Sequence, residues 1–189
     1  MERAELSHPA ETGRAFDRLS YMATTDIGFR VRQATSKDAA SLCLILNEII
    51  VIGGTTAYET HFSVIEFDNH LLSGDGCIVC SIAETLTGEA LGFQSLLKNS
   101  DLPVGWGDIA TFTRREPRRP GTGTALFQST VAFARNFGLV AINATIRADN
   151  YSGIPYYEKM GFTTYNVARG VPLKDGTPVD RISKSYSLA

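Results

Sequence analysis

Two glycines, Gly121 and Gly123, stand where the 189-residue chain is best suited to hold an anion. They follow the segment 109–113, which alternates like a strand, and they precede a helical pattern that includes Leu126. Glycine lets the backbone turn sharply and approach a ligand closely, and the first N–H groups of a helix have no partner within it. The pattern predicts either a phosphate-binding loop or an ordinary surface turn.

Two familiar phosphate loops are excluded. No Lys-Ser/Thr pair follows the second glycine, as a Walker A loop requires, and Leu126 occupies the place of the third glycine of a Rossmann loop. Arginines at positions 114, 115, 118 and 119 surround the turn. A positive patch of this size suits a small polyanion.

The turn resembles the acyl-CoA loop of the GNAT acyltransferase superfamily. The family pattern Gln/Arg-x-x-Gly-x-Gly/Ala is satisfied by Arg118, Gly121 and Gly123. A second block, residues 150–162, reads NYSGIPYYEKMGF and resembles the signature Asn-x-x-small-x-x-x-Tyr-Glu-Lys-x-Gly-Phe. Either block alone is a weak signal, but together they have the order and spacing of the family. The resemblance covers about residues 28–188 and implies central strands that splay apart to admit the pantetheine arm of acetyl-CoA.

The resemblance also implies which residues carry an acetyl transfer. Tyr157 matches a tyrosine that protonates the departing thiolate, since a phenol with an ordinary pKa near 10 keeps its proton at neutral pH; a tyrosine packed on the sheet is the alternative. Asn150 matches a residue that contacts the CoA arm, and it also suits a helix cap. A backbone N–H at a bulge in the strand before the loop, that of Phe112 or Thr113, would stabilise the oxyanion. The predicted cofactor-binding residues are Phe112, Thr113, Arg118, Arg119, Gly121, Thr122, Gly123, Thr124 and Asn150.

On the acceptor side, Asp108 is the acidic candidate for the base. It stands where the phosphinothricin N-acetyltransferase-like branch of the family carries a glutamate, although the strand after it reads Ile-Ala-Thr-Phe-Thr instead of ending in Ser/Thr-x-Tyr-Val. A solvated acid at a strand end is the alternative. The segment 55–58 also resembles that branch, which places Tyr58 and Glu59 at the wall of the acceptor pocket; a plain connection between helices is the alternative.

Composition limits the partners. The chain carries a formal net charge of −2 and is 43% hydrophobic, enough for one core. This balance argues against a general nucleic-acid or membrane-surface binder, and no apolar run approaches the ~20 residues of a membrane span. Residues 1–25 lack the apolar centre of a secretory signal. We therefore expect a cytoplasmic protein without nucleic-acid or membrane partners.

The three cysteines, Cys43, Cys77 and Cys80, also indicate a reducing compartment, because an odd number does not suit a disulfide framework. Cys77 and Cys80 have the spacing of a redox motif. However, they lie in an apolar strand pattern, in which residues three apart point to opposite faces, so we interpret them as structural. The histidines show no ligand spacing, and we predict no metal site.

The remaining pattern alternates strands and helices. Strands are expected at 29–34, 77–84, 90–98, 105–113, 139–146, 163–168 and 179–188, and helices at 42–49, 64–72, 126–137 and 150–160. On the third helix, Leu126, Thr130, Phe133 and Phe137 should form one helical stripe, and Gly138 should end the helix.

This order predicts an α/β (α+β) fold of the GNAT type, with a mixed central sheet of about seven strands and helices on both faces. We expect residues 28–189 to form the acetyltransferase domain. Residues 1–27 are polar and are expected to form a partly disordered extension, in which residues 10–22 could be a short helix.

Residues and resemblance together predict an N-acetyltransferase that moves an acetyl group from acetyl-CoA to a small primary amine. The branch resemblance implies an amino acid or analogue, such as phosphinothricin or methionine sulfoximine, as the acceptor. Acetylation of a protein N-terminus or lysine, and a non-catalytic acyl-CoA-binding regulator, are the alternatives. Because dimers are common in the family, we expect a homodimer.

Overall fold

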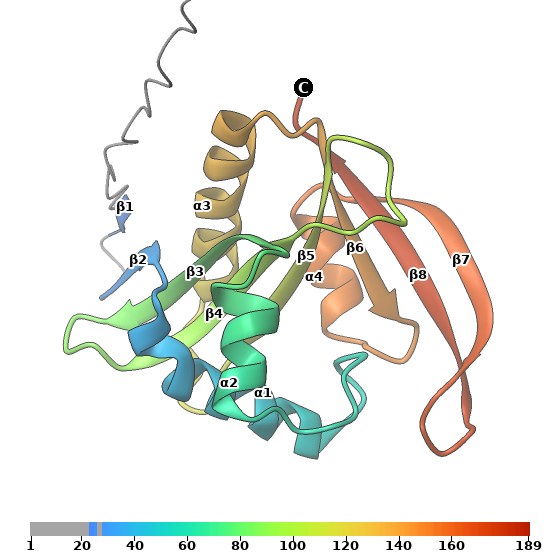
Figure 1. Ribbon diagram of the computed structural model, residues 1–189, viewed down its shortest axis with the longest axis horizontal. Helices are drawn as coiled ribbons and strands as arrows, with labels where there is room; N and C mark the ends of the chain where they lie inside the picture. The colour runs from blue at the N-terminus through green and yellow to red at the C-terminus, as the bar shows by residue number, and fades with distance from the viewer. Residues whose placement is uncertain (1–22, 26–27) are drawn as a thin grey trace, which may run out of the picture.

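The computed structural model describes residues 23–25 and 28–189, so the short helix considered for residues 10–22 lies outside the described residues. Within them, one mixed sheet of eight strands has the order β1-β2-β3-β4-β5-β6-β8-β7 (Figure 1). The strands are β1 Ala23–Thr25, β2 Phe29–Gln33, β3 Cys77–Thr85, β4 Ala90–Leu97, β5 Trp106–Thr113, β6 Ala141–Arg147, β7 Thr163–Pro172 and β8 Pro178–Ser187. The expected fold class is confirmed. The additional strand, β1, lies in the predicted extension and pairs with β2.

Helices cover both faces of the sheet, because alternate residues of each central strand are apolar on both sides. The helical elements are η1 Ser36–Asp38, α1 Ala39–Ile52, α2 Val64–Phe67, η2 Asp68–Leu72, α3 Thr122–Phe137 and α4 Gly153–Lys159. Elements α1, α2 and η2 pack on the side of Phe93 and Phe112, which we call the α1–α2 face. Helices α3 and α4 pack on the side of Ile109 and Ile142, which we call the α3–α4 face.

Helix α3 begins and ends at glycines in the left-handed region. Gly121 has φ 87° and Gly138 has φ 86°, conformations that cost a residue with a Cβ more than they cost glycine. Gly138 therefore ends the helix as predicted. Of the predicted helical stripe, Leu126 and Thr130 are buried, whereas Phe137 is 55% exposed and the buried face continues at Ala134, one turn earlier.

The two central strands β5 and β6 run parallel and then separate. Their ladder contains only the pairs Trp106↔Ala141, Gly107↔Ile142 and Asp108↔Asn143. Beyond that point, β5 continues along β4 to Thr113, and β6 continues along β8 to Arg147. We call the end of the shared ladder the fork. The splay that the resemblance implied is therefore present, and it begins at Asp108 and Asn143.

The two cysteines of β3 lie on one face, which corrects the expectation that they point apart. A register shift between Cys77 and Val79 puts one extra residue into the strand. Ile78 and Val79 consequently both pack on the α3–α4 side, whereas Cys77 and Cys80 both pack on the α1–α2 side. Burial raises the pKa of the Cys77 thiol to about 11 and that of Cys80 to about 12. Both are free thiols that stay protonated at neutral pH, in keeping with a structural role.

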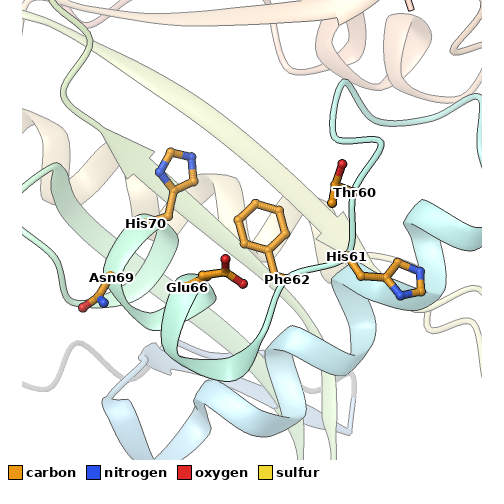
Figure 2. A pocket seen from close by; sticks show the side chains of 6 residues that line it. All are labelled: Thr60, His61, Phe62, Glu66, Asn69 and His70. Carbon is orange, nitrogen blue, oxygen red and sulfur yellow. The ribbon is translucent and has the colours of Figure 1, made fainter. Parts of the chain in front are cut away.

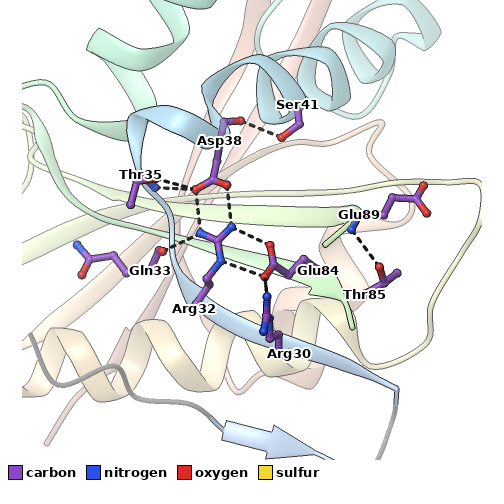
Figure 3. A network of polar contacts seen from close by, with 9 residues as sticks. All are labelled: Arg30, Arg32, Gln33, Thr35, Asp38, Ser41, Glu84, Thr85 and Glu89. Atoms are coloured by element: carbon purple, nitrogen blue, oxygen red, sulfur yellow. Dashed lines mark hydrogen bonds and ion pairs between the residues drawn. The ribbon is translucent and has the colours of Figure 1, made fainter. Parts of the chain in front are cut away.

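A network of ion pairs fastens the first strands to the start of α1 (Figure 3). The Arg32 guanidinium contacts the carboxylates of Asp38 and Glu84, each at 2.7 Å, and Arg30 also reaches Glu84. Hydrogen bonds from Arg32 lower the pKa of both carboxyl groups. Because the Glu84 side chain is only 3% exposed, its charge depends on these two arginines for compensation.

Candidate active site

Tyr157 of α4 lies on the α3–α4 face, beside the separated part of β5. Its hydroxyl is 3.0 Å from Oγ1 of Thr111, three residues beyond the fork. The side chain is 7% exposed. Burial, the neighbouring Tyr156 and the charge of Asp108 raise the pKa of Tyr157 above that of an ordinary phenol. Tyr157 thus carries a proton across the whole neutral range at a place where two strands part.

The second tyrosine of the pair, Tyr156, faces the glycine loop. Its hydroxyl donates to the carbonyl oxygen of Gly123 at 2.9 Å and accepts from Nε2 of Gln94 at 3.3 Å. Its ring packs so closely that a Cβ on Gly123 would lie 2.9 Å from a ring carbon. Glycine is therefore needed at position 123 for contact with Tyr156, and not for an unusual backbone conformation.

The glycine loop presents free donors at the start of α3. The amides of Gly123 and Thr124 lie in the first turn, where no intrahelical acceptor exists. Thr122 is turned inward, with its hydroxyl donating to the carbonyl oxygen of Arg119 at 2.7 Å. Arg118 and Arg119 are exposed beside this turn. Free amides, a helix N-terminus and two arginines fit the pyrophosphate of acetyl-CoA.

The pairing of β5 distinguishes the two residues considered as oxyanion donors. Arg114 N donates to Leu91 O at 2.9 Å, and the register to β4 continues without a shift, so the expected bulge is not found. In an antiparallel pair, every second residue points its N–H and C=O groups to the partner strand. Phe112, like Arg114, therefore points these groups to β4, whereas Thr113 points them to the opposite edge of β5. That edge faces the gap beyond the fork. The register therefore favours Thr113 over Phe112, whose ring is buried on the α1–α2 face.

Asp108 lies at the fork on the α1–α2 face, the side opposite Tyr157, because alternate residues of β5 point to opposite faces. Its Oδ1 accepts from Nδ2 of Asn143 at 2.7 Å, and its Oδ2 accepts from Nδ2 of Asn99 at 3.0 Å. Tyr165 in turn donates to Oδ1 of Asn143 at 2.7 Å. Asn99, Asn143 and Tyr165 come from three separate segments, and their meeting with Asp108 was not predicted from the sequence.

The segment before α2 forms a wall on the same face as Asp108. The Tyr58 hydroxyl is 3.2 Å from Nε2 of His70, and the Tyr58 ring meets the Phe62 ring edge to face. Burial and the charge of Asp108 raise the pKa of Tyr58 to about 12. The role of Tyr58 as a wall of the acceptor pocket stays a prediction.

Asn150 and Glu59 fix this wall in place. Nδ2 of Asn150 donates to the Thr55 carbonyl oxygen at 2.8 Å, while its Oδ1 accepts from the amide of Gly153 at the start of α4. Oε2 of Glu59 accepts from the amide of Lys174, in the turn of the β7–β8 hairpin, at 2.8 Å. Asn150 is thus a helix cap and a tether, and its contact with the CoA arm stays a prediction.

A pocket of about 460 Å³ opens beside Tyr58. Its lining residues are Thr60, His61, Phe62, Glu66, Asn69 and His70. Figure 2 shows Phe62, Glu66 and His70 converging on it, while His61 points away. The Phe62 and His70 rings are stacked with their centroids 6.0 Å apart, and the Glu66 carboxylate is held by Ser63 at the start of α2.

The family of the chain follows from the sequence comparison. The model of the Acetyltransferase (GNAT) family matches residues 44–162, more than half of the chain, so this protein belongs to that family. Members transfer acyl groups from acyl-CoA to amines, and the protein is accordingly an acyl-CoA-dependent N-acetyltransferase with acetyl-CoA as co-substrate. No curated protein matches the sequence.

Solved structures share the fold at low sequence identity. A phosphinothricin acetyltransferase from Sinorhizobium meliloti, in complex with acetyl-CoA, is 22% identical with a TM-score of 0.74; the alignment covers 86% of this chain and 89% of that one. An N-acetyltransferase from Staphylococcus aureus is 19% identical with a TM-score of 0.73, covering 85% and 99%. A ribosomal-protein-alanine N-acetyltransferase from Brucella melitensis is 21% identical with a TM-score of 0.71, covering 83% and 98%.

Within residues 23–25 and 28–189, no group of three or more His, Cys, Asp or Glu side chains is placed to hold a metal ion. In the same part of the chain, no helix has both the length and the apolar character needed to cross a membrane.

Proposed function

We propose that the protein acetylates the primary amine of a small molecule, and that this acceptor is an amino acid or a close analogue such as phosphinothricin or methionine sulfoximine. The observation that carries the proposal is the tethered wall on the α1–α2 face, the face on which Asp108 lies. The wall, which contains Tyr58, is tied to α4 through Asn150 and to the β7–β8 hairpin through Glu59. A wall held in place in this way suits a small acceptor better than an extended peptide.

In this proposal the acceptor and acetyl-CoA approach from opposite faces of β5. Asp108 attracts the acceptor as an ammonium ion and takes one of its protons through a water molecule. Its two asparagine partners leave further lone pairs free for that contact. The neutral amine attacks the thioester carbon, and the Thr113 amide donates to the oxyanion.

When the tetrahedral intermediate collapses, the carbon–sulfur bond breaks, the thiolate takes the proton of Tyr157, and the nitrogen releases its extra proton to water. The products are the N-acetylated amine and free CoA thiol. Tyr157 regains its proton from solvent before the next turnover. The loop amides of residues 119–124, with Arg118 and Arg119, hold the pyrophosphate of the co-substrate.

The cellular setting follows from the same chemistry. We propose that the protein works in the cytoplasm, where acetyl-CoA and small amines are both present, as a homodimer that is formed by residues 28–189. Neither nucleic acid nor a membrane is needed for this reaction.

The test is thiol release from acetyl-CoA against a panel of acceptors. The panel contains amino acids, phosphinothricin, methionine sulfoximine, simple alkyl amines and peptides with free N-termini or lysines. We expect at least one amino-acid-like amine to raise thiol release far above the rate with peptides, with an N-acetylated product of the correct mass. Preference for peptides would replace the proposed acceptor class, and tight CoA binding without thiol release would favour a regulator.

A further inference from the structure

A row of polar side chains crosses three central strands on the α3–α4 face. Ser81 of β3 pairs with Gln94 of β4, and Gln94 pairs with Thr111 of β5, so the three side chains stand side by side. Gln94 is completely buried, with 0% exposure. A buried amide is costly unless its polar atoms make hydrogen bonds. Gln94 therefore calls for an explanation that packing does not provide.

The direction of the hydrogen bonds around Gln94 is determined by the glycine loop. The carbonyl oxygen of Gly123 can only accept, so the Tyr156 hydroxyl gives it its single proton at 2.9 Å. The oxygen of Tyr156 must then accept from Gln94, which requires the amide nitrogen of Gln94 at that position, 3.3 Å away. A flipped amide would bring two lone pairs together. The contact with Gly123 thus fixes which end of Gln94 faces the tyrosines.

The same nitrogen reaches Thr111. Nε2 of Gln94 donates its second proton to Oγ1 of Thr111 at 2.8 Å. Because Thr111 accepts there, its own proton is free to be donated to the Tyr157 hydroxyl oxygen, 3.0 Å away. Oε1 of Gln94 has no hydrogen-bond partner among the described residues. Oε1 therefore does not take the hydroxyl proton of Thr111, which leaves Thr111 able to donate to Tyr157.

We propose that Gln94 is a positioning residue that makes Tyr157 a proton donor. In this series of hydrogen bonds, Gln94 donates to Thr111 and Thr111 donates to Tyr157. Tyr157 consequently keeps its own proton unshared and directs it to the gap beyond the fork. This inference rests on the proposed function, because it concerns the proton that the thiolate receives when the carbon–sulfur bond breaks.

The variant Gln94→Leu tests this series of hydrogen bonds, since leucine roughly preserves the buried volume and removes both protons that Gln94 donates. We expect turnover to fall by at least about tenfold, a part of the ~10²–10⁴-fold effect of a general acid, with the Michaelis constant for acetyl-CoA unchanged. Thr111→Val should have the same effect, and Thr111→Ser should restore turnover. Ser81→Ala is the matched control, because Ser81 is buried in the same row but, among the described residues, its hydroxyl makes a hydrogen bond only with Ser129, at 3.5 Å.

A double-mutant cycle separates positioning from packing. If Gln94 acts through Tyr157, then Gln94→Leu in a Tyr157→Phe background costs no further activity. Full additivity of the two losses overturns the inference, as does wild-type turnover in a folded Gln94→Leu protein. Melting temperatures from circular dichroism check the fold. If Gln94→Leu does not fold, the variants Thr111→Val and Thr111→Ser provide the same test.

Thiol release without any amine, with water as the nucleophile, is measured in the same variants. This rate depends on protonation of the thiolate but not on the identity of the acceptor. Failure of every small amine to raise thiol release above the water rate would reject the proposed acceptor class alone. A Gln94→Leu protein that matches wild type while Tyr157→Phe is slow would reject the positioning role alone.

Discussion

The Tyr157 hydroxyl and the Asp108 carboxylate lie on opposite faces of the same strand, β5, where it separates from β6. Tyr157 contacts Thr111 from the α3–α4 side, and Asp108 lies in the last shared pair with Asn143. The charge of Asp108 contributes to the raised pKa of Tyr157, so the two groups interact across the fork. In the proposed reaction, Tyr157 serves acetyl-CoA from one face of β5 and Asp108 serves the acceptor amine from the other.

The close contact of Gly123 and Tyr156 predicts the effect of a side chain in the loop. Gly123→Val places its Cβ against the Tyr156 ring, so either the ring or the first turn of α3 must move. We expect CoA affinity to fall at least about tenfold, as measured by calorimetry, while the protein remains folded. Gly76→Val is the matched control, because a Cβ there meets open space. Unchanged affinity in Gly123→Val would remove the loop from the cofactor site.

Asp108→Asn tests the proposed contact with the acceptor amine. The variant keeps size and polarity but removes the charge that attracts an ammonium ion. We expect a lower rate at neutral pH and partial recovery at high pH, where an alkyl amine with a pKa near 10 loses its proton in solution. CoA affinity should not change. The exposed Asp101→Asn is the control, and superimposable pH–rate profiles of wild type and Asp108→Asn would exclude both roles of Asp108.

The ion pairs of Arg32 predict a specific loss of stability in acid. The pKa values of Asp38 and Glu84 are lowered in the folded protein, so their contribution is present above the unfolded pKa values near 4 and is lost as the pH falls through the folded ones. Arg32→Met should therefore lower the melting temperature strongly at pH 7 and less at pH 3. Arg169→Met, which removes a pair in which the arginine is 79% exposed, should have little effect at either pH. A constant difference between wild type and Arg32→Met across this range would contradict the assignment.

Burial of Tyr157 predicts the alkaline side of the pH–rate profile. Because its pKa is raised above that of an ordinary phenol, the proton needed by the thiolate is still present at pH 10. We expect turnover with a saturating amine to stay level up to that pH. A decline centred near pH 9 would mean that Tyr157 is not the acid or that it is exposed to solvent during the reaction.

Local sequence was sufficient for the parts of the site that lie in single stretches. The loop with Gly121 and Gly123 and the block that begins at Asn150 each specify a short backbone path, and Gly138 marks a helix end by its own conformation. Contacts between distant strands were not predictable in this way. The meeting of Asp108 with Asn99 and Asn143 depends on register, which no local pattern contains.

The prediction that Cys77 and Cys80 point to opposite faces was wrong, because it assumed strict alternation along β3. A single bulge in β3 moves Cys77 to the face of Cys80, because one extra residue reverses the alternation. Gln94 went unnoticed because it and Ser95 are the only polar side chains in a strand that is otherwise apolar. Such an interruption is a usable signal, since a buried amide at the centre of a sheet requires partners.

The variant Tyr157→Phe tests the account most directly, since it keeps the buried ring and removes only the hydroxyl. Turnover is measured as thiol release with the best amine, together with the Michaelis constant for acetyl-CoA and the melting temperature. The account predicts a fall in turnover of about 10²–10⁴-fold with little change in that Michaelis constant. Turnover within about twofold of wild type, in a protein that is equally stable, would contradict it, because another group or water would then protonate the thiolate.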